Sequence, residues 1–215
     1  MNQHSIRISA PTRAEFIKRG RNLEYFTIGY NSLEGLIAVG AGVVAGSIAL
    51  VGFGFDSLIE VTSGAVLLWR LYADVDEARR ERVEATSLRV VGICFIVLAL
   101  YVTQNSIWSL LKREAPDESL VGIILAAVSL VVMPLLVRAK RKVARSINSG
   151  ALMADSKQTE LCTYLSAILL GGLLLNALLG WWWADPVAAL IMVPIIGKEG
   201  IEALRGETCC DDACH

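Results

Sequence analysis

Two carboxylates four residues apart lie inside an apolar segment that is long enough to span a bilayer. Asp56 and Glu60 belong to the run GSIALVGFGFDSLIE, and residues four apart share one face of an α-helix. An ionised side chain near the bilayer centre costs at least about 2.5–3.5 kcal/mol unless it has a partner. A bound divalent cation or protonation would remove that cost, since close carboxylates titrate as a coupled pair. The pair therefore predicts an ion site that exchanges a metal ion for protons.

The alternative for this pair is a structural ion pair with a basic residue inside the membrane. No Lys or Arg lies deep in any of the apolar segments that we delimit below. We therefore favour the ion site over the structural ion pair.

A second segment, ADSKQTELCTYLS, offers partners for the two carboxylates. At about 100° per residue, Asp155, Gln158 and Cys162 share one helix face with Ser166, and Glu160 points away from it. Two carboxylates, an amide oxygen and a thiolate would make a four-ligand site that suits Zn²⁺ and softer ions. Taken alone, Cys162 reads equally well as a small buried core residue. Glu160 could instead pair with Lys157 at the mouth of the site.

Glu34 is a further candidate, because it lies in the first apolar segment three residues after Asn31. Residues three apart are neighbours on a helix surface. The two side chains could form a second polar station or a proton relay, and a hydrogen-bonded structural glutamate is an equally good interpretation.

The C-terminal tail gathers three cysteines and a histidine. Thiolates and imidazole bind transition metals, so these residues predict a flexible metal-capturing tail, although their spacing matches no structural zinc finger. The alternative is a reactive tail without a function. The residues are Cys209, Cys210, Cys214 and His215.

Composition and segment lengths place these residues in a membrane protein. Hydrophobic residues make up 54% of the 215 residues and charged residues 19%, below the roughly 25% that is usual in soluble domains. The net charge of −1 argues against a nucleic-acid partner. Six apolar segments predict an all-α bundle of six transmembrane helices. They cover about residues 25–45, 48–72, 88–111, 119–137, 153–180 and 184–204.

The connecting segments predict the orientation. With six spans, nearly all Lys and Arg residues fall on one side, and only Lys112 and Arg113 fall on the other. The positive-inside rule then puts both termini in the cytosol of a multi-pass protein of the cell inner membrane. The predicted organisation is a basic cytosolic segment (1–22), a six-helix transmembrane domain (23–206) and the Cys-rich cytosolic tail (207–215).

Small residues near the join of the first two helices predict close packing. Gly42 and Gly46 are four apart near the end of the first apolar segment, and small residues let helix backbones approach closely in lipid. We interpret them as packing of the first helix against the second rather than as a dimer interface.

Three motifs resemble those of cation diffusion facilitator transporters. GSIALVGFGFDSLIE is similar to the second helix of that family, where G-S-x-A-L…D-S-x-x-D carries two metal ligands. ADSKQTELCTYLS resembles the fifth helix, where an A-D lead is followed by His-x-x-x-Asp. WWWADPVAAL resembles the D-P-x-A-A-L start of the sixth helix.

The resemblance implies a proton-coupled exporter of divalent metal that is usually a homodimer working by alternating access. By position, Asp56 and Glu60 match the ligands of the second helix, and Gln158 and Cys162 match the His and Asp of the fifth. These two are departures from the family pattern, and an alternative register would bring Asp155 or Glu160 to the ion. The family's usual soluble metal-sensing domain is expected to be missing, so that dimerisation would rest on the membrane helices.

The leading hypothesis is a secondary transporter that is surrounded by membrane lipid. We do not expect an enzyme. The transporter would export Zn²⁺ or Cd²⁺ in exchange for protons and need no cofactor besides its transported ion. The alternative is a non-transporting metal-binding membrane protein that sequesters ions or modulates a partner. An enzyme is disfavoured because no His lies in the apolar segments and no nucleophile–base pair is visible.

Overall fold

The computed structural model describes residues 13–72, 77–113, 116–147 and 149–205. These residues form six helices and no strand, so the predicted all-α fold is confirmed. The helices are α1 (Arg13–Ala45), α2 (Ile48–Tyr72), α3 (Glu77–Lys112), α4 (Leu120–Ile147), α5 (Gly150–Leu179) and α6 (Ala184–Arg205). The four metal-binding candidates of the tail lie outside the described residues.

The helices have the length and surface of a membrane bundle. Five of them, α1 to α5, are long and apolar enough to cross a membrane. α6 has 22 residues, or about 33 Å of helix at 1.5 Å per residue, and it carries charged residues that include Asp185, Lys198 and Glu199. Large hydrophobic side chains such as Leu36 and Val44 are exposed on the outside of the bundle, as expected for a surface that faces lipid.

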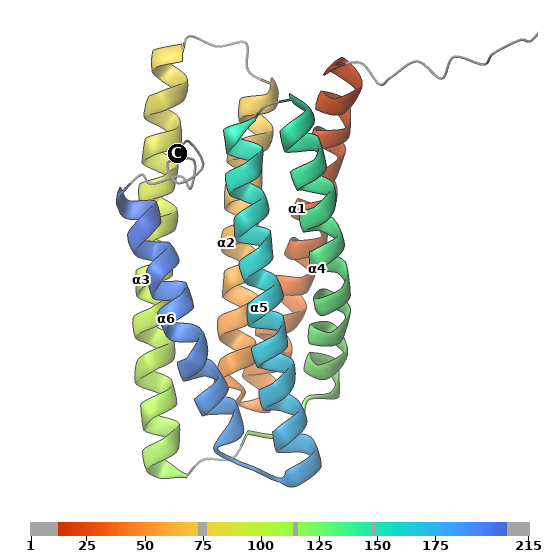
Figure 1. Cartoon of the computed structure of the whole chain (residues 1–215). Helices are drawn as coiled ribbons and strands as arrows, with labels where there is room; N and C mark the ends of the chain where they lie inside the picture. The colour runs from red at the N-terminus through yellow and green to blue at the C-terminus, as the bar shows by residue number, and fades with distance from the viewer. Residues whose placement is uncertain (1–12, 73–76, 114–115, 148, 206–215) are drawn as a thin grey trace, which may run out of the picture.

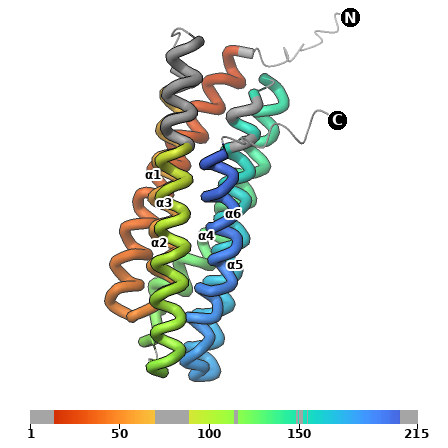
Figure 2. The backbone as a smooth tube through the Cα atoms, turned by 90° about the vertical axis from the view of Figure 1, so that its left-hand side faces the viewer, coloured from red at the N-terminus to blue at the C-terminus, as the bar shows by residue number. Residues whose placement is uncertain are grey.

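The six helices run up and down in alternation and fall into two groups (Figure 1). α1, α2, α4 and α5 form one group, in which α1 packs chiefly on α2 and α4 on α5. α3 and α6 form a pair that packs against α2 and α5. The start of α1 and the end of α6 lie toward the same end of the bundle (Figure 2). α2 and α5 are therefore central and contact each other.

Three helices extend beyond the apolar segments that we delimited. α1 begins at Arg13 rather than near residue 25, α3 begins at Glu77 rather than near 88, and α4 continues to Ile147 rather than ending near 137. Arg, Lys, Glu and Ala are good helix formers, so polarity marks where the apolar surface ends and not where the helix ends. The basic segment that follows residue 137 is therefore helical as far as Ile147 and is not a loop there, which matters for the site described below.

The predicted close packing of the first two helices is confirmed at Gly42. A Cβ added there would lie 2.8 Å from the backbone nitrogen of Val51 on α2. Gly46 has another role than we expected. It lies after the end of α1 with a φ of +68°, a backbone conformation that glycine adopts at little cost. Gly46 therefore makes the turn between α1 and α2.

Two of the motifs that carried the family resemblance meet where α2 and α6 begin. The Ser47 hydroxyl donates to Asp185 Oδ1 at 2.5 Å, and the backbone N–H of Ile48 donates to Asp185 Oδ2 at 2.9 Å. The first N–H groups of a helix have no partner within the helix. The Asp185 carboxylate on α6 is the partner that accepts from the N–H of Ile48. This bond holds the start of α6 against the start of α2.

Candidate metal site

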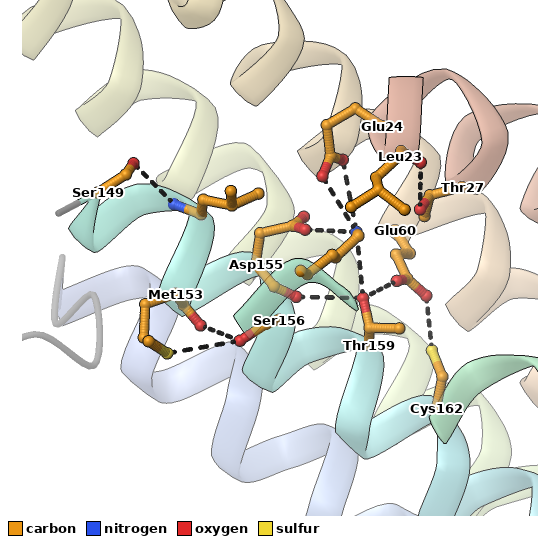
Figure 3. Close-up of polar contacts among 12 residues, drawn as sticks. Leu23, Glu24, Thr27, Glu60, Ser149, Met153, Asp155, Ser156, Thr159 and Cys162 are labelled. Atoms are coloured by element: carbon orange, nitrogen blue, oxygen red, sulfur yellow. Dashed lines mark hydrogen bonds and ion pairs between the residues drawn. The ribbon is translucent and has the colours of Figure 1, made fainter. Parts of the chain in front are cut away.

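Asp56 and Glu60 lie buried on the face of α2 that meets α5. The Cys162 Sγ lies 3.0 Å from Asp56 Oδ2 and 2.8 Å from Glu60 Oε2 as a hydrogen-bond donor. Figure 3 shows Cys162 beneath Glu60. The structure therefore brings together the three residues that the helix spacing predicted, and we call them the acid–thiol site.

The acidic groups of the acid–thiol site are not matched by an ion pair within the described part of the chain. No Lys, Arg or His side chain in the part of the chain that the structure describes forms an ion pair with Asp56 or Glu60. Buried carboxylates normally have a cationic or metal partner, or are protonated. The site therefore requires protons or a cation from outside.

The donor set fits a metal ion after a small adjustment. No group of three or more His, Cys, Asp and Glu side chains among the described residues is arranged to hold a metal ion as it stands, because the thiol and carboxylates of the acid–thiol site hydrogen bond to one another. Tetrahedral zinc bonds of about 2.3 Å to sulfur and 2.0 Å to oxygen separate the two donors by about 3.5 Å. The sulfur–oxygen distances of 2.8 and 3.0 Å would have to lengthen by about 0.5 to 0.7 Å.

Gln158, the fourth predicted ligand, has no hydrogen bond to Asp56, Glu60 or Cys162 among those of the described residues. Its amide nitrogen is buried without a hydrogen-bond partner among the described residues. The next residue, Thr159, contacts the site instead, because its hydroxyl donates to Glu60 Oε1 at 2.7 Å. Gln158 therefore remains a candidate ligand, and Thr159 is a site residue that the sequence analysis missed.

A buried lysine, just outside the fourth apolar segment, lies next to the acid–thiol site, so the absence of Lys and Arg from the apolar segments does not mean that no base lies inside the bundle. The Lys140 ammonium contacts Asp155 Oδ2 at 2.5 Å and Glu24 Oε1 at 3.3 Å, and its side chain is 0% exposed. These three residues come from α4, α5 and α1, and we call them the Lys140 triad. Figure 3 labels its two acids, Glu24 and Asp155. Asp155, which we considered as a metal ligand, thus has a structural cation as its partner.

Glu160 is also placed by a basic partner. Arg141 donates to Glu160 Oε2 at 2.6 Å, with side chains that are 31% and 35% exposed. The predicted orientation of Glu160 away from the site is confirmed. Arg141 is a partner that we did not predict, because α4 continues as a helix past Arg141 and brings that guanidinium alongside α5.

Glu34 forms a separate polar group between α1 and α2. It accepts hydrogen bonds from Tyr30 and Ser57, each at 3.0 Å. Ser57 follows Asp56 in the chain, so this group borders the acid–thiol site without contacting it through a hydrogen bond. Both amide atoms of Asn31 are buried without a hydrogen-bond partner among the described residues, so Asn31 and Glu34 do not bond to each other.

A sequence signal for the buried triad existed on α1. Small and polar residues recur there every three or four positions and all are buried, which is the spacing of one helix face. They are Gly20, Glu24, Thr27, Asn31, Gly35, Ala38, Gly42 and Ala45. This pattern places Glu24 on the face that meets the bundle.

A membrane-embedded helical bundle with buried acids against a thiol is typical of a protein that handles cations. The profile of the cation efflux transmembrane domain matches residues 27–207. The chain belongs to this cation efflux family.

Several proteins are similar to this chain. An uncharacterized transporter of Synechocystis sp. is 26% identical over 160 residues, which are 72% of this chain and 52% of that protein. The cation-efflux pump FieF of Shewanella oneidensis is 27% identical over 118 residues, 55% of this chain and 38% of that protein. Transmembrane protein 163 of Xenopus laevis is 21% identical over 203 residues, 94% of this chain and 72% of that protein. The chain thus spans about half the length of the first of these proteins and less than two fifths of the second.

Proposed function

We propose that this protein is a secondary transporter that moves a divalent transition or heavy metal ion across the membrane in exchange for protons. The ion is held between α2 and α5 by Asp56, Glu60 and Cys162. The observation that supports this most strongly is the contact of the Cys162 sulfur with both carboxylates, at 3.0 and 2.8 Å, inside the bundle.

Charge balance supports exchange rather than simple binding. The acid–thiol site carries two acidic groups and no basic partner among the described residues. Two protons or one divalent cation neutralise two carboxylates equally well, and a metal ion bound by the Cys162 sulfur also displaces the thiol proton, because the thiolate is the ligand. An empty, fully ionised site leaves like charges unpaired in a low-dielectric interior. Loading with one species therefore favours release of the other.

The thiol favours zinc and cadmium as the ions. Thiolate ligands select softer cations, whereas carboxylate, carbonyl and water ligands suit magnesium, calcium and manganese. Cys162 is buried on the face that carries the carboxylates. The fourth position would be taken by Gln158 or by water, since zinc is usually four-coordinate.

The basic residues support export from the cytosol. The helix ends near Lys18, Lys142 and Arg205 lie at one end of the bundle, and Lys112 lies at the other. The positive-inside rule assigns the first of these ends to the cytosol. The acid–thiol site would then take its ion from the cytosolic side.

The proposal is tested by flux in proteoliposomes that contain the purified full chain. A pH gradient should drive uptake of Zn²⁺ or Cd²⁺, and metal flux should in turn move protons. Asp56→Asn should abolish the flux, while Glu118→Gln, at an exposed carboxyl, should leave it unchanged. If the chain binds metal but moves none, sequestration replaces transport as the function. If the chain shows no binding and no flux, the metal site is contradicted.

A further inference from the structure

We propose that Thr159 is a positioning residue that makes Glu60 bind the ion through one oxygen only, and so sets which cations the site accepts. The inference rests on the proposed function, because it concerns the ion held by the acid–thiol site. It follows from the hydrogen bonds that connect this site with the Lys140 triad.

The Lys140 ammonium fixes the direction of the Thr159 hydroxyl. The ammonium lies 2.5 Å from Asp155, 3.3 Å from Glu24 and 3.3 Å from Thr159 Oγ1. An ammonium has three donors and accepts nothing, so the threonine oxygen must accept from it. The single hydroxyl proton of Thr159 is then free to donate elsewhere.

Two acceptors lie within reach of that proton. Glu60 Oε1 is at 2.7 Å and the backbone carbonyl of Asp155 is at 3.2 Å. Hydrogen bonds to a carboxylate are shorter and stronger than those to a neutral carbonyl. The hydroxyl therefore donates to Glu60, and Figure 3 shows Thr159 lying between Asp155 and Glu60.

The two oxygens of Glu60 thus have different roles. Oε1 accepts from Thr159, and Oε2 faces Cys162 at 2.8 Å. Only Oε2 is directed to the place where Cys162 and Asp56 would share an ion. Tetrahedral zinc needs one oxygen from each carboxylate, whereas larger, harder ions of high coordination number often take both. Thr159 thereby disfavours the harder ions.

Thr163, one turn further along α5, provides a matched control. Its hydroxyl bonds to the backbone carbonyl of Thr159 at 3.4 Å, which is a common arrangement for a threonine inside a helix. The two residues share a type and a helix, and differ in whether the hydroxyl reaches a carboxylate of the acid–thiol site.

The experiment measures binding of Cd²⁺ and Mn²⁺, and the visible absorption of bound Co²⁺, on the purified full chain in detergent. Thr159→Val should lower the ratio of Cd²⁺ to Mn²⁺ affinity by about 10-fold, the lower end of the effects of groups that orient a metal ligand. Its Co²⁺ absorption should weaken, because cobalt of higher coordination number absorbs less than tetrahedral cobalt. Thr159→Ser should keep the wild-type ratio and spectrum, as should Thr163→Val.

Three results would overturn the inference. One is a wild-type affinity ratio and cobalt spectrum in Thr159→Val, and another is an equal change in Thr163→Val. The third result is a wild-type chain that binds no metal, which contradicts the proposed function as well. If Thr159→Val does not fold, Thr159→Ala is measured in its place with the same expectation. Normal wild-type binding with no effect of Thr159 contradicts this inference alone.

Discussion

Two polar clusters lie next to each other on α5, and they differ in whether they contain a cation. The Lys140 triad combines two carboxylates with one ammonium, and every donor of that ammonium has an acceptor. The acid–thiol site combines two carboxylates with a thiol and has no basic partner among the described residues. Buried charges persist when they are paired. The first cluster is therefore suited to hold helices together, and the second to receive an ion.

Their positions along α5 fit this division. Asp155 lies in the second turn of α5, and Cys162 lies about 10 Å further along at 1.5 Å per residue. Thr159, between them, contacts both clusters. The Lys140 triad thus lies nearer the helix ends, and the acid–thiol site lies deeper in the bundle.

The largest expected effect on stability is at Lys140. Replacing it by methionine leaves Glu24 and Asp155 buried without a cation, and breaking a buried ion pair in this way costs about 3–5 kcal/mol. The Lys140→Met variant should show this loss in the free energy of unfolding in detergent. A loss below about 1 kcal/mol, the range of exposed pairs, would mean that the triad does not stabilise the bundle.

The second prediction concerns Asp56, where function and stability should separate. Asp56→Asn removes one of two neighbouring acidic groups that have no cation, so the free energy of unfolding should not fall. The affinity for Zn²⁺ should fall more than about 100-fold, because losing a ligand exceeds the 10- to 100-fold effect of losing a group that orients one. Isothermal titration and thermal unfolding of the same preparation measure both quantities. Unchanged affinity together with lost stability would reverse the roles that we assign to the two clusters.

The third prediction concerns the sulfur. Cys162→Ser keeps a small polar side chain against Asp56 and Glu60 but removes the soft ligand. Affinity for Cd²⁺ should fall by a factor on the order of 10 more than affinity for Mn²⁺. Competition binding with the two ions on one sample measures this difference. Equal losses for both ions would show that Cys162 contributes only packing.

The smallest effect is expected at Arg141, the neighbour of Lys140. Its pair with Glu160 joins α4 and α5, as the contact of Lys140 with Asp155 does, at a similar distance, 2.6 Å, but both side chains are about a third exposed. Exposed ion pairs contribute less than about 1 kcal/mol. Arg141→Met should therefore change the free energy of unfolding by less than that amount, under the conditions used for Lys140→Met. A loss as large as that of Lys140→Met would mean that burial is not what distinguishes the two pairs.

The acid–thiol site could be predicted because its residues stand out inside apolar segments. Asp56 and Glu60 are four apart on one helix, and Cys162 lies on the polar face of another. Helix periodicity fixes which side chains share a face, and the absence of water makes an acid inside a span informative. The contact between the two helices was predicted from the family resemblance together with this periodicity.

Lys140 could not be recognised in the same way, because it stands in the basic run RAKRK. Its neighbours Arg138, Arg141 and Lys142 are partly or fully exposed, whereas Lys140 is buried. Such a run reads as a solvated loop after a membrane span. Only the continuation of α4 makes it helical, and then Lys140 lies seven residues after the buried Met133, on the same face. Burial at one position in a charged run is decided by helix packing and not by composition.

Thr159 shows a second limit of sequence reasoning. Threonine inside a helix usually bonds to the backbone of the preceding turn, as Thr163 does, so its type carries little information. Its role depends on the Lys140 ammonium on one side and Glu60 on the other. Those partners come from two other helices, and only the three-dimensional structure identifies them.

If the acid–thiol site is an ion site, its cation comes from outside the protein. Anomalous diffraction from a crystal of the full chain soaked in Cd²⁺ tests it directly, since the signal locates the metal and its ligands together. We predict an anomalous peak between α2 and α5, bonded to Cys162 Sγ and to one oxygen each of Asp56 and Glu60. A peak only elsewhere, or none between these helices in a saturated crystal, would contradict the account.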